Sequence, residues 1–489
     1  MTGKKTLRIA IVGAGASGLM ALIKLREAGL PDVTIFEKAD SLGGTWRDNR
    51  YPGLTCDVPS LAYRYSFAPN SEWSHVCAPG PEILEYLKDI AARYDLERDI
   101  RYGAEMRTAE FRDGQWHVTT SQGDEGAFDV VLAAAGVLHH PAYPDIEGLD
   151  TFKGDTFHTA RWPDNFSLKG KRVGVIGTGS TATQITGAII DEVASLSLFQ
   201  RTPQWILPLA NDPIPEEQRE AYRANPALLE EEFVRLSAQQ TESFAAAVVG
   251  ENPRAYEALE NYCKDHLNLV TDPDLRARLT PDYRVGCKRL IMSGNFYQAI
   301  QKDNAELVTD AITRIEPAGV RTSDANSKDG RLHELDVLVL ATGFDAHKIM
   351  SPMIVKGRSG KRLDETWASA QEAYLAVTIP DFPNWFMIGG PNSPVGNFSW
   401  LQTAELQFGY ALKLIETLRT GNVRELSPKP EALRAFNDAV KAKMPDTVWA
   451  SGCKSWYINK DGHVASWPWT FDKFKRDMTE PVMEDYLFG

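Results

Sequence analysis

The chain has 489 residues, of which 43% are hydrophobic and 24% charged, and this is the balance of an ordinary globular protein, not of a disordered or fibrous one. Its 53 Lys and Arg face 66 Asp and Glu, which leaves a formal net charge of −13. Such a charge repels phosphate backbones and anionic lipid, so we expect neither nucleic acid nor a membrane as a partner. At roughly 150 residues per domain, the length predicts about three domains, or two with an insertion.

Targeting segments and metal-binding patterns are not evident. No apolar run approaches the ~18 residues that a membrane-spanning helix needs, and the basic start of the chain lacks the features of a signal peptide, so we expect a cytoplasmic protein. No two cysteines stand at C-x-x-C spacing, so dithiol redox chemistry and a cysteine zinc site have little support from the sequence, and we expect no metal. The cysteines are odd in number and scattered, as is typical of a reducing cytosol: Cys56, Cys77, Cys263, Cys287 and Cys453.

Residues 7–37 are predicted to form a β-α-β unit. Ile9–Val12 is a short apolar run, typical of a strand buried on both faces, and a second such run follows at Val33–Phe36. A helix is expected between them from Leu19 to Glu27. Residues 171–201 repeat this plan, so the chain is predicted to hold two nucleotide-binding domains.

The first turn carries a dinucleotide fingerprint. Gly13, Gly15 and Gly18 stand in G-x-G-x-x-G between strand and helix, where glycines allow the tight turn, the approach of a pyrophosphate and close helix packing. Glu37 ends the second strand, 24 residues after Gly13, where a carboxylate can hold ribose hydroxyls. The alternative is a glycine loop that binds nothing.

The second turn differs in one informative way. Gly177 and Gly179 begin a G-x-G-x-x-A version, but Gln200 occupies the position that corresponds to Glu37, and Arg201 follows it. A carboxylate that would repel a 2′-phosphate is therefore absent and a cation stands beside its place, which predicts NADP(H) instead of NAD(H). The alternative is that Arg201 is an ordinary surface residue.

The fold class that follows is α/β, with two Rossmann-like dinucleotide-binding domains and a helical insertion. Residues 1–150 and 346–489 are assigned to the first domain and residues 151–345 to the second. A segment rich in Glu, Ala, Leu and Arg, at about 209–280, is expected to be the insertion. One site for a ribose-chelated dinucleotide and one for NADPH together suggest a flavoprotein, with FAD in the first domain and NADP in the second.

Two long, gapped patterns narrow the type of flavoprotein. The pattern F-x-G-x-x-x-H-x-x-x-W-[P/D] is matched by the linker residues Phe152, Gly154, His158 and Trp162. A second pattern, [A/G]-G-x-W-x4-[F/Y]-P-[G/M]-x3-D, is matched from Gly43 to Asp57. On these patterns the chain resembles the type I Baeyer–Villiger monooxygenases, and the resemblance extends over nearly the whole sequence.

This resemblance implies an enzyme that uses FAD, NADPH and O2 to convert ketones to esters or lactones, through a C4a-peroxyflavin and a Criegee intermediate. It implies that Arg289 is the active-site arginine and that Asp57 is its paired aspartate. The residues that it assigns to FAD are Gly13, Gly15, Ser17, Gly18, Glu37, Lys38, Gly44, Thr45, Trp46, Asp57, Tyr63, Met106 and Trp400. Those that it assigns to NADP are Gly177, Gly179, Ser180, Thr181, Gln184, Arg201, Thr202, Lys288 and Trp456.

The expected chemistry explains the choice of arginine. Oxygen transfer to a carbonyl requires an anionic peroxide and passes through an alkoxide, and a guanidinium beside these charges cannot give up its proton. Other interpretations stay open from the residues alone: Arg289 as a phosphate ligand, Asp57 as a turn cap, and His158 as a surface histidine instead of a residue that positions the linker. Alternative functions are oxygenation of nitrogen or sulfur, and a non-oxygenating NADPH-binding redox protein. The particular ketone and the oligomeric state stay unknown, with a monomer among the possibilities.

Overall fold

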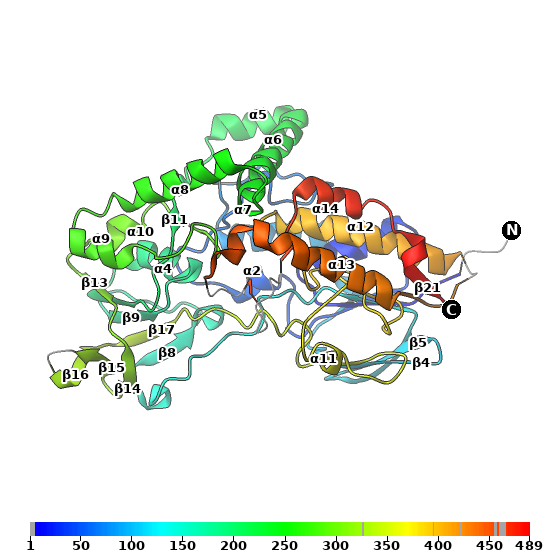
Figure 1. Ribbon diagram of the computed structural model, residues 1–489, viewed down its shortest axis with the longest axis horizontal. Helices are drawn as coiled ribbons and strands as arrows, with labels where there is room; N and C mark the ends of the chain where they lie inside the picture. Colours follow the sequence, from blue (N-terminus) through cyan, green and yellow to red (C-terminus); the bar gives the residue numbers. More distant parts are fainter. Residues whose placement is uncertain (1–4, 325–326, 395, 421–422, 454–456, 459–465) are drawn as a thin grey trace.

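The structure is a computed structural model that describes residues 5–324, 327–394, 396–420, 423–453, 457–458 and 466–489. Two parallel sheets form its frame, one in each half of the molecule. Figure 1 shows strands of the second sheet, β8, β9, β13 and β17, at the left of the view. The predicted α/β fold is therefore confirmed.

The first sheet has the strand order β19-β7-β1-β2-β3. Its central strand β1 pairs in parallel with β2 on one side and β7 on the other, and its side chains are covered because Ile9 and Ile11 pack in one apolar cluster and Ala10 in another on the opposite face. The edge strand β19 comes from far along the chain, so the C-terminal part of the sequence returns to complete this sheet. The strands span Ile9–Val12 (β1), Val33–Phe36 (β2), Ile100–Arg101 (β3), Val130–Ala133 (β7) and Trp385–Met387 (β19).

Helices cover one face of the first sheet, where Ile9 and Ile11 pack with residues of α1, α3 and α12, while the antiparallel meander of residues 106–128 packs on the other face. Helix α1 packs beside α12, and the guanidinium of Arg419 near the end of α12 donates to the carbonyl oxygens of Ala28 and Gly29 after α1. The helices of this half span Ala16–Glu27 (α1), Thr45–Asp48 (α2), Gly80–Arg93 (α3), Leu363–Thr366 (α11), Trp400–Arg419 (α12), Pro430–Lys443 (α13) and Phe471–Asp477 (α14).

The second sheet has the strand order β13-β10-β9-β17-β8, and its strands are also parallel. Helix α4 (Ser180–Ile189) follows β9 as the predicted unit requires, and α10 (Phe296–Ala299) packs against α4. The strands span Asp155–His158 (β8), Arg172–Ile176 (β9), Ser195–Phe199 (β10), Ala305–Val308 (β13) and Val337–Leu340 (β17).

Smaller sheets extend the two halves. Strand β18 (Ile354–Lys356) joins an antiparallel meander, while another meander, β14-β15-β16, extends from the second half. The first meander comprises Met106–Arg112 (β4), Gln115–Thr120 (β5) and Gly123–Phe128 (β6); the second comprises Ile312–Glu316 (β14), Gly319–Asp324 (β15) and Ser327–Glu334 (β16). Two short pairs are Ile206–Leu207 (β11) with Ile291–Met292 (β12), and Leu426–Pro428 (β20) with Tyr486–Phe488 (β21).

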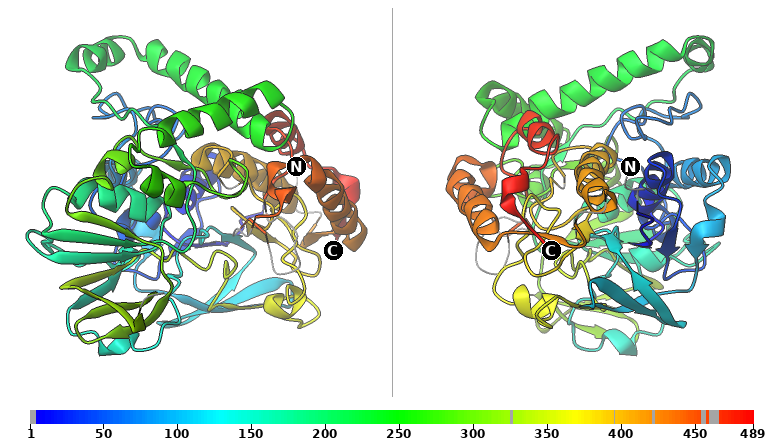
Figure 2. Two further views of the ribbon diagram at one scale, coloured as in Figure 1. Left: turned by 60° about the vertical axis from the view of Figure 1, so that its left-hand side comes forward. Right: turned by 90° about the vertical axis from the view of Figure 1, so that its right-hand side faces the viewer.

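The segment expected at about 209–280 is helical, and it projects over the two halves in the views of Figure 2. Arg64, whose side chain is fully buried, pairs with Glu230 at 2.8 Å and lies over the ring of Phe233, so an ion pair and a cation–π contact hold this insertion on the first half. Its helices span Glu216–Ala224 (α5), Pro226–Gln239 (α6), Ala246–Val248 (α7), Pro253–Leu267 (α8) and Pro273–Leu279 (α9), with a π-helical turn at Gln240–Ala245 between α6 and α7.

The cysteines differ from the reduced set that the sequence suggested. Cys287 and Cys453 form a disulfide with a Cα–Cα distance of 6.1 Å, although 166 positions separate them in the chain. Cys56, Cys77 and Cys263 are free and buried. Spacing along the sequence could not reveal the bond because the tertiary fold alone brings the two segments together. Among the described residues, no helix is both long and apolar enough to cross a bilayer.

Candidate active site

The first glycine turn has the geometry of a dinucleotide loop. Gly13 has a φ of +96°, which disfavours other residues, and a Cβ on Gly18 would lie 1.9 Å from the Gly13 carbonyl oxygen. Gly15 lies against Gly44, where a Cβ on Gly44 would be 3.2 Å from the Gly15 Cα. The backbone at the N-terminus of α1 is thereby left open for a phosphate group.

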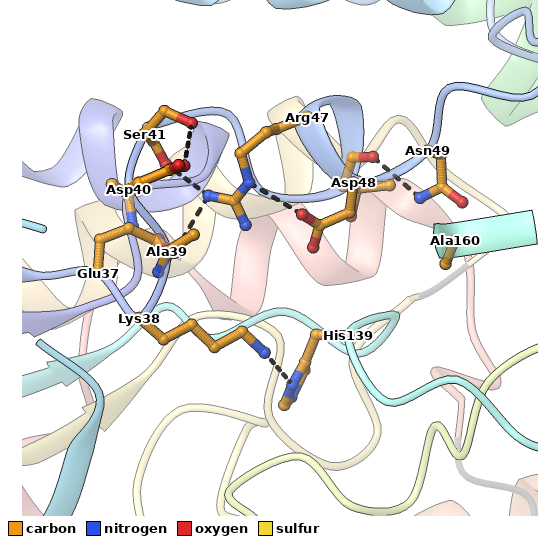
Figure 3. Close-up of polar contacts among 12 residues, drawn as sticks. Glu37, Lys38, Ala39, Asp40, Ser41, Arg47, Asp48, Asn49, His139 and Ala160 are labelled. Atoms are coloured by element: carbon orange, nitrogen blue, oxygen red, sulfur yellow. Dashed lines mark hydrogen bonds and ion pairs between the residues drawn. The ribbon is translucent and has the colours of Figure 1, made fainter. Parts of the chain in front are cut away.

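Glu37 lies at the end of β2, as the fingerprint requires. Its carboxylate accepts hydrogen bonds from the amides of Ala14 and Ala39, at 2.8 and 2.9 Å. The guanidinium of Arg47 is 3.1 Å from the same carboxylate and also pairs with Asp48 at 2.9 Å (Figure 3). Arg47 is a site residue that the sequence analysis missed, because neither pattern specifies a residue at its position.

Lys38, the residue after Glu37, reaches across the loop. Its ammonium lies 3.3 Å from Nδ1 of His139, and Figure 3 shows the two side chains meeting below the Arg47 group. Burial and the charge of Lys38 lower the pKa of His139 to about 4, so this imidazole is neutral near pH 7. The ring of His139 also lies 3.2 Å from the Ile349 carbonyl oxygen.

The second glycine turn repeats the first in a more open form. Gly177 has a φ of +122°, and a Cβ there would lie 2.3 Å from the carbonyl oxygen of Ala341. A Cβ on Gly179 would meet nothing within 4 Å, so space for a ligand is present at the N-terminus of α4. Gln200 is buried and its amide donates to the carbonyl oxygen of Arg278 at 2.7 Å, so this side chain is occupied by the protein.

Cations gather beside this second turn. Burial lowers the pKa of Lys288, and the nearby charges of Asp282 and Arg201 shift it in opposite directions. The ammonium of Lys288 lies 4.5 Å from the centre of the Tyr283 ring. Arg201 and Lys288 come from segments far apart in the sequence, and their proximity suits a doubly charged phosphate.

Arg289 and Asp57 meet across the two halves. Nη2 of Arg289 lies 2.5 Å from Oδ2 of Asp57, and 35% of the arginine side chain and 31% of the aspartate side chain stay exposed. Asp57 raises the pKa of Arg289 more than burial lowers it, so the guanidinium keeps its charge. The pair therefore presents a permanent cation with a fixed orientation.

The turn before Asp57 explains how it reaches Arg289. Gly53, with a φ of +78°, approaches α4 so closely that a Cβ would lie 2.7 Å from the Gln184 carbonyl oxygen. The Tyr51 hydroxyl donates to the Gln184 side chain at 2.9 Å, and the Gln184 amide donates to Thr55 at 3.0 Å. Gln184, which the resemblance assigned to NADP, thus joins the two halves through both ends of its amide.

One cavity of 1780 Å³ connects these groups. Both glycine turns line it, and so do Arg289 and Asp57, while the insertion contributes Phe244 and Tyr262. The expected site residues that line it are Gly13, Gly15, Ser17, Glu37, Lys38, Gly44, Thr45, Trp46, Asp57, Tyr63, Met106 and Trp400 near the first turn, and Gly177, Gly179, Ser180, Thr181, Gln184, Arg201, Thr202, Lys288 and Arg289 near the second.

Gly18 and the four linker residues, although expected in the site, are not among the residues that line the cavity. Gly18 packs behind the turn against Gly13, and Trp456 lies outside the described residues. Tyr457 is buried and hydrogen-bonded with Arg289. No pattern in the sequence pointed to this contact.

The linker residues lie behind the second turn. His158 is buried, its Nδ1 accepts from the Ala160 amide, and its Nε2 lies 3.0 Å from the Gly343 carbonyl oxygen. Burial lowers the pKa of His158, so a neutral ring joins the linker to the turn after β17. A Cβ on Gly154 would lie 2.4 Å from the Asp336 carbonyl oxygen and 2.6 Å from the ring of Phe152, and Trp162 packs edge-on against Phe157. These contacts support a positioning role.

Comparisons with known proteins agree with this geometry. The family model described as "Flavin-binding monooxygenase-like" matches residues 6–213. A Streptomyces coelicolor protein named Baeyer-Villiger monooxygenase is 37% identical over 98% of this chain and 92% of its own length. The chain belongs to the Baeyer–Villiger type of the flavin-binding monooxygenase-like family.

Other members of this family give the same result. An uncharacterized monooxygenase of Mycobacterium tuberculosis is 46% identical over 99% of this chain and 97% of its own. The crystal structure of a cyclohexanone monooxygenase from Rhodococcus sp. Phi1, bound to NADP+, has a TM-score of 0.87 with 30% identity, and 99% of each chain is covered. The family predicted from the linker and Gly43–Asp57 patterns is thereby confirmed, and the chain is a flavin monooxygenase.

Proposed function

We propose that this protein is a Baeyer–Villiger monooxygenase that binds FAD at the first glycine turn and NADPH at the second, and inserts one oxygen atom of O2 beside the carbonyl of a ketone. The observation that carries the proposal is the Arg289–Asp57 pair, held at 2.5 Å on the wall of a cavity that also contains both glycine turns.

The first turn fits a flavin dinucleotide. Gly15 and Gly44 present bare backbone to the cavity, and the Trp400 indole donates to Ser17 at 3.1 Å, which orders the start of α1. Glu37 is fixed by two backbone amides at the end of β2, where a ribose would be bound. When bound there, a flavin supplies the chemistry that accepts hydride from a nicotinamide and activates O2.

The second turn fits NADPH. Gly179 leaves open space at the helix N-terminus for the pyrophosphate, and Arg201 with Lys288 would hold the 2′-phosphate. Gln200 places a neutral amide, not a carboxylate, beside this turn, so no negative charge would repel the 2′-phosphate. Its amide donates to a backbone carbonyl. NADH lacks the phosphate and would gain nothing from these cations.

Arg289 would bind the oxygen atoms that carry negative charge during transfer to the ketone. Its charge is secured by Asp57, and about a third of its side chain faces the cavity and is available to a ligand. One well-aimed donor to such an oxyanion lowers the activation barrier by about 3–4 kcal/mol. Phe244 and Tyr262 of the insertion form part of the wall where the ketone would lie. The apolar share of this wall would exclude water from the charged oxygen.

The test is a labelling experiment with the purified flavin-loaded protein. NADPH, ¹⁸O2 and a panel of cyclic, linear and aryl ketones are supplied, and products are identified by mass spectrometry. The proposal predicts esters or lactones that carry one ¹⁸O atom, with one NADPH consumed for each. Oxides of added sulfides or amines as sole products, or hydrogen peroxide as sole product with every ketone, would contradict it.

A further inference from the structure

The disulfide joins two segments that meet at Arg289. Cys287 precedes Arg289 by two residues, and Cys453 precedes Tyr457 by four. Their Cα atoms are 6.1 Å apart, a distance that a disulfide spans without displacement of the backbone. The bond therefore links the segment that carries Arg289, just before β12, to the C-terminal segment that carries Tyr457.

Tyr457 is the second group that holds the guanidinium. It is 3% exposed, and its hydroxyl is hydrogen-bonded with Arg289. A Cβ on Gly396 would lie 2.2 Å from the Tyr457 hydroxyl and 3.0 Å from Nη1 of Arg289, so the three groups are in close approach. Nη2 of Arg289 thus donates to Asp57, while Nη1 lies on the side of Gly396 and Tyr457.

The surroundings of the disulfide make the connection stiff. Trp449 is buried, and its ring centre lies 5.5 Å from that of Tyr457. Cys287 is completely buried and Cys453 is 8% exposed, so neither sulfur has room to move far while the bond is intact. Only one residue, Lys288, separates Cys287 from Arg289, so the crosslink lies next to the backbone that carries the guanidinium.

We propose that the Cys287–Cys453 disulfide is a redox-reversible crosslink that positions Arg289, formed when hydrogen peroxide oxidises the thiol pair. The inference rests on the proposed function, because it assigns to Arg289 the task of holding charged oxygen. Cys287 and Cys453 do not line the cavity, whereas Arg289 does, so the role assigned to the crosslink is to position Arg289.

The oxidation balances with peroxide as the only oxidant. One thiolate attacks a peroxide oxygen, the O–O bond breaks, and a sulfenic acid forms with release of one water after protonation. The second thiol then displaces the sulfenic oxygen as another water, and the S–S bond forms. Two thiols lose two electrons and two protons, and one H2O2 becomes two H2O. An oxygenase that fails to transfer its oxygen to a ketone releases hydrogen peroxide, so the proposed activity itself supplies the oxidant.

The first measurement counts thiols. The flavin-loaded protein is treated with hydrogen peroxide or with dithiothreitol, denatured in iodoacetamide, and weighed by mass spectrometry. We expect three alkylated cysteines after peroxide, namely the free residues Cys56, Cys77 and Cys263, and all five after dithiothreitol. Five after both treatments, or three after both, would overturn the proposal of a reversible crosslink.

The second measurement separates positioning from mere stability. Cys453→Ser and Cys287→Ser are compared with Cys263→Ser, a matched control that removes a buried free thiol of α8. We expect both crosslink variants to release peroxide without ketone about tenfold faster and to form correspondingly less ester per NADPH, since small displacements of a catalytic group cost one to two orders of magnitude. The Cys263→Ser rates should stay within about twofold of wild type, a margin well below that effect.

If the disulfide only stabilised the fold, the two crosslink variants would have a lower melting temperature but an unchanged rate of peroxide release per flavin. That result would overturn the positioning role. The proposed function fails separately: wild type would then yield no ester from any ketone. The thiol count and the ketone-independent peroxide rate would still report on the crosslink in that case.

Discussion

Replacing Arg289 with alanine tests the link between structure and chemistry most directly. The change removes the charged group that lies 2.5 Å from Asp57 on the cavity wall and leaves Arg201 and Lys288 in place for the phosphate of NADPH. One lost oxyanion donor is worth about 3–4 kcal/mol, so ester formation should fall about 100- to 1,000-fold while reduction of the flavin by NADPH changes only a few-fold. Stopped-flow absorbance of the flavin measures the reduction, and gas chromatography measures the ester.

Matched variants control for folding and for charge. Arg289→Lys keeps a cation but loses the planar guanidinium that can contact Asp57 and an oxyanion together, so we expect it to retain activity between alanine and wild type. Arg50→Ala removes a guanidinium that is 50% exposed and paired with Asp164, and it should leave both rates unchanged. If Arg289→Ala kept more than about a third of the ester yield per NADPH, far above the loss expected for an oxyanion donor, the assigned role would be refuted.

Three further outcomes are expected. Arg201→Ala should raise the KM for NADPH about tenfold and leave that for NADH unchanged, since only NADPH carries the 2′-phosphate; equal changes would contradict the phosphate assignment. Gly396→Ala, with a φ of +91° and a Cβ 2.2 Å from the Tyr457 hydroxyl, should lower both the melting temperature and the ester yield, and wild-type values for both would show that the segment adapts. The pKa of His139 is lowered to about 4, so the unfolded chain binds a proton that the folded one does not as pH falls below about 6.5. Stability should therefore fall between pH 6.5 and 4, by up to about 1.4 kcal/mol per pH unit from this group, and stay flat above; His139→Gln should reduce that slope in urea unfolding, and identical slopes would refute the assignment.

The sequence by itself determined the elements whose signals are local. A run such as Ile9–Val12 must be buried on both faces, and a glycine such as Gly13 is needed where φ is positive, so strand, turn and helix could be placed within a few residues. The substitution of Gln200 for a carboxylate is equally local, although its bond to the Arg278 carbonyl was not foreseeable. The family patterns, which are longer, pointed to Arg289 and Asp57 without any geometry.

The tertiary structure alone decided how the distant groups meet. Asp57 and Arg289 are 232 positions apart, Cys287 and Cys453 are 166 apart, and Gln184 joins the two halves through Tyr51. Each contact depends on how one packed unit docks on another, and the hydrophobic periodicity of a segment records which face it buries but not which partner covers it. The residues of the candidate site therefore come together at an interface between units, where side-chain shape and loop geometry select the neighbours.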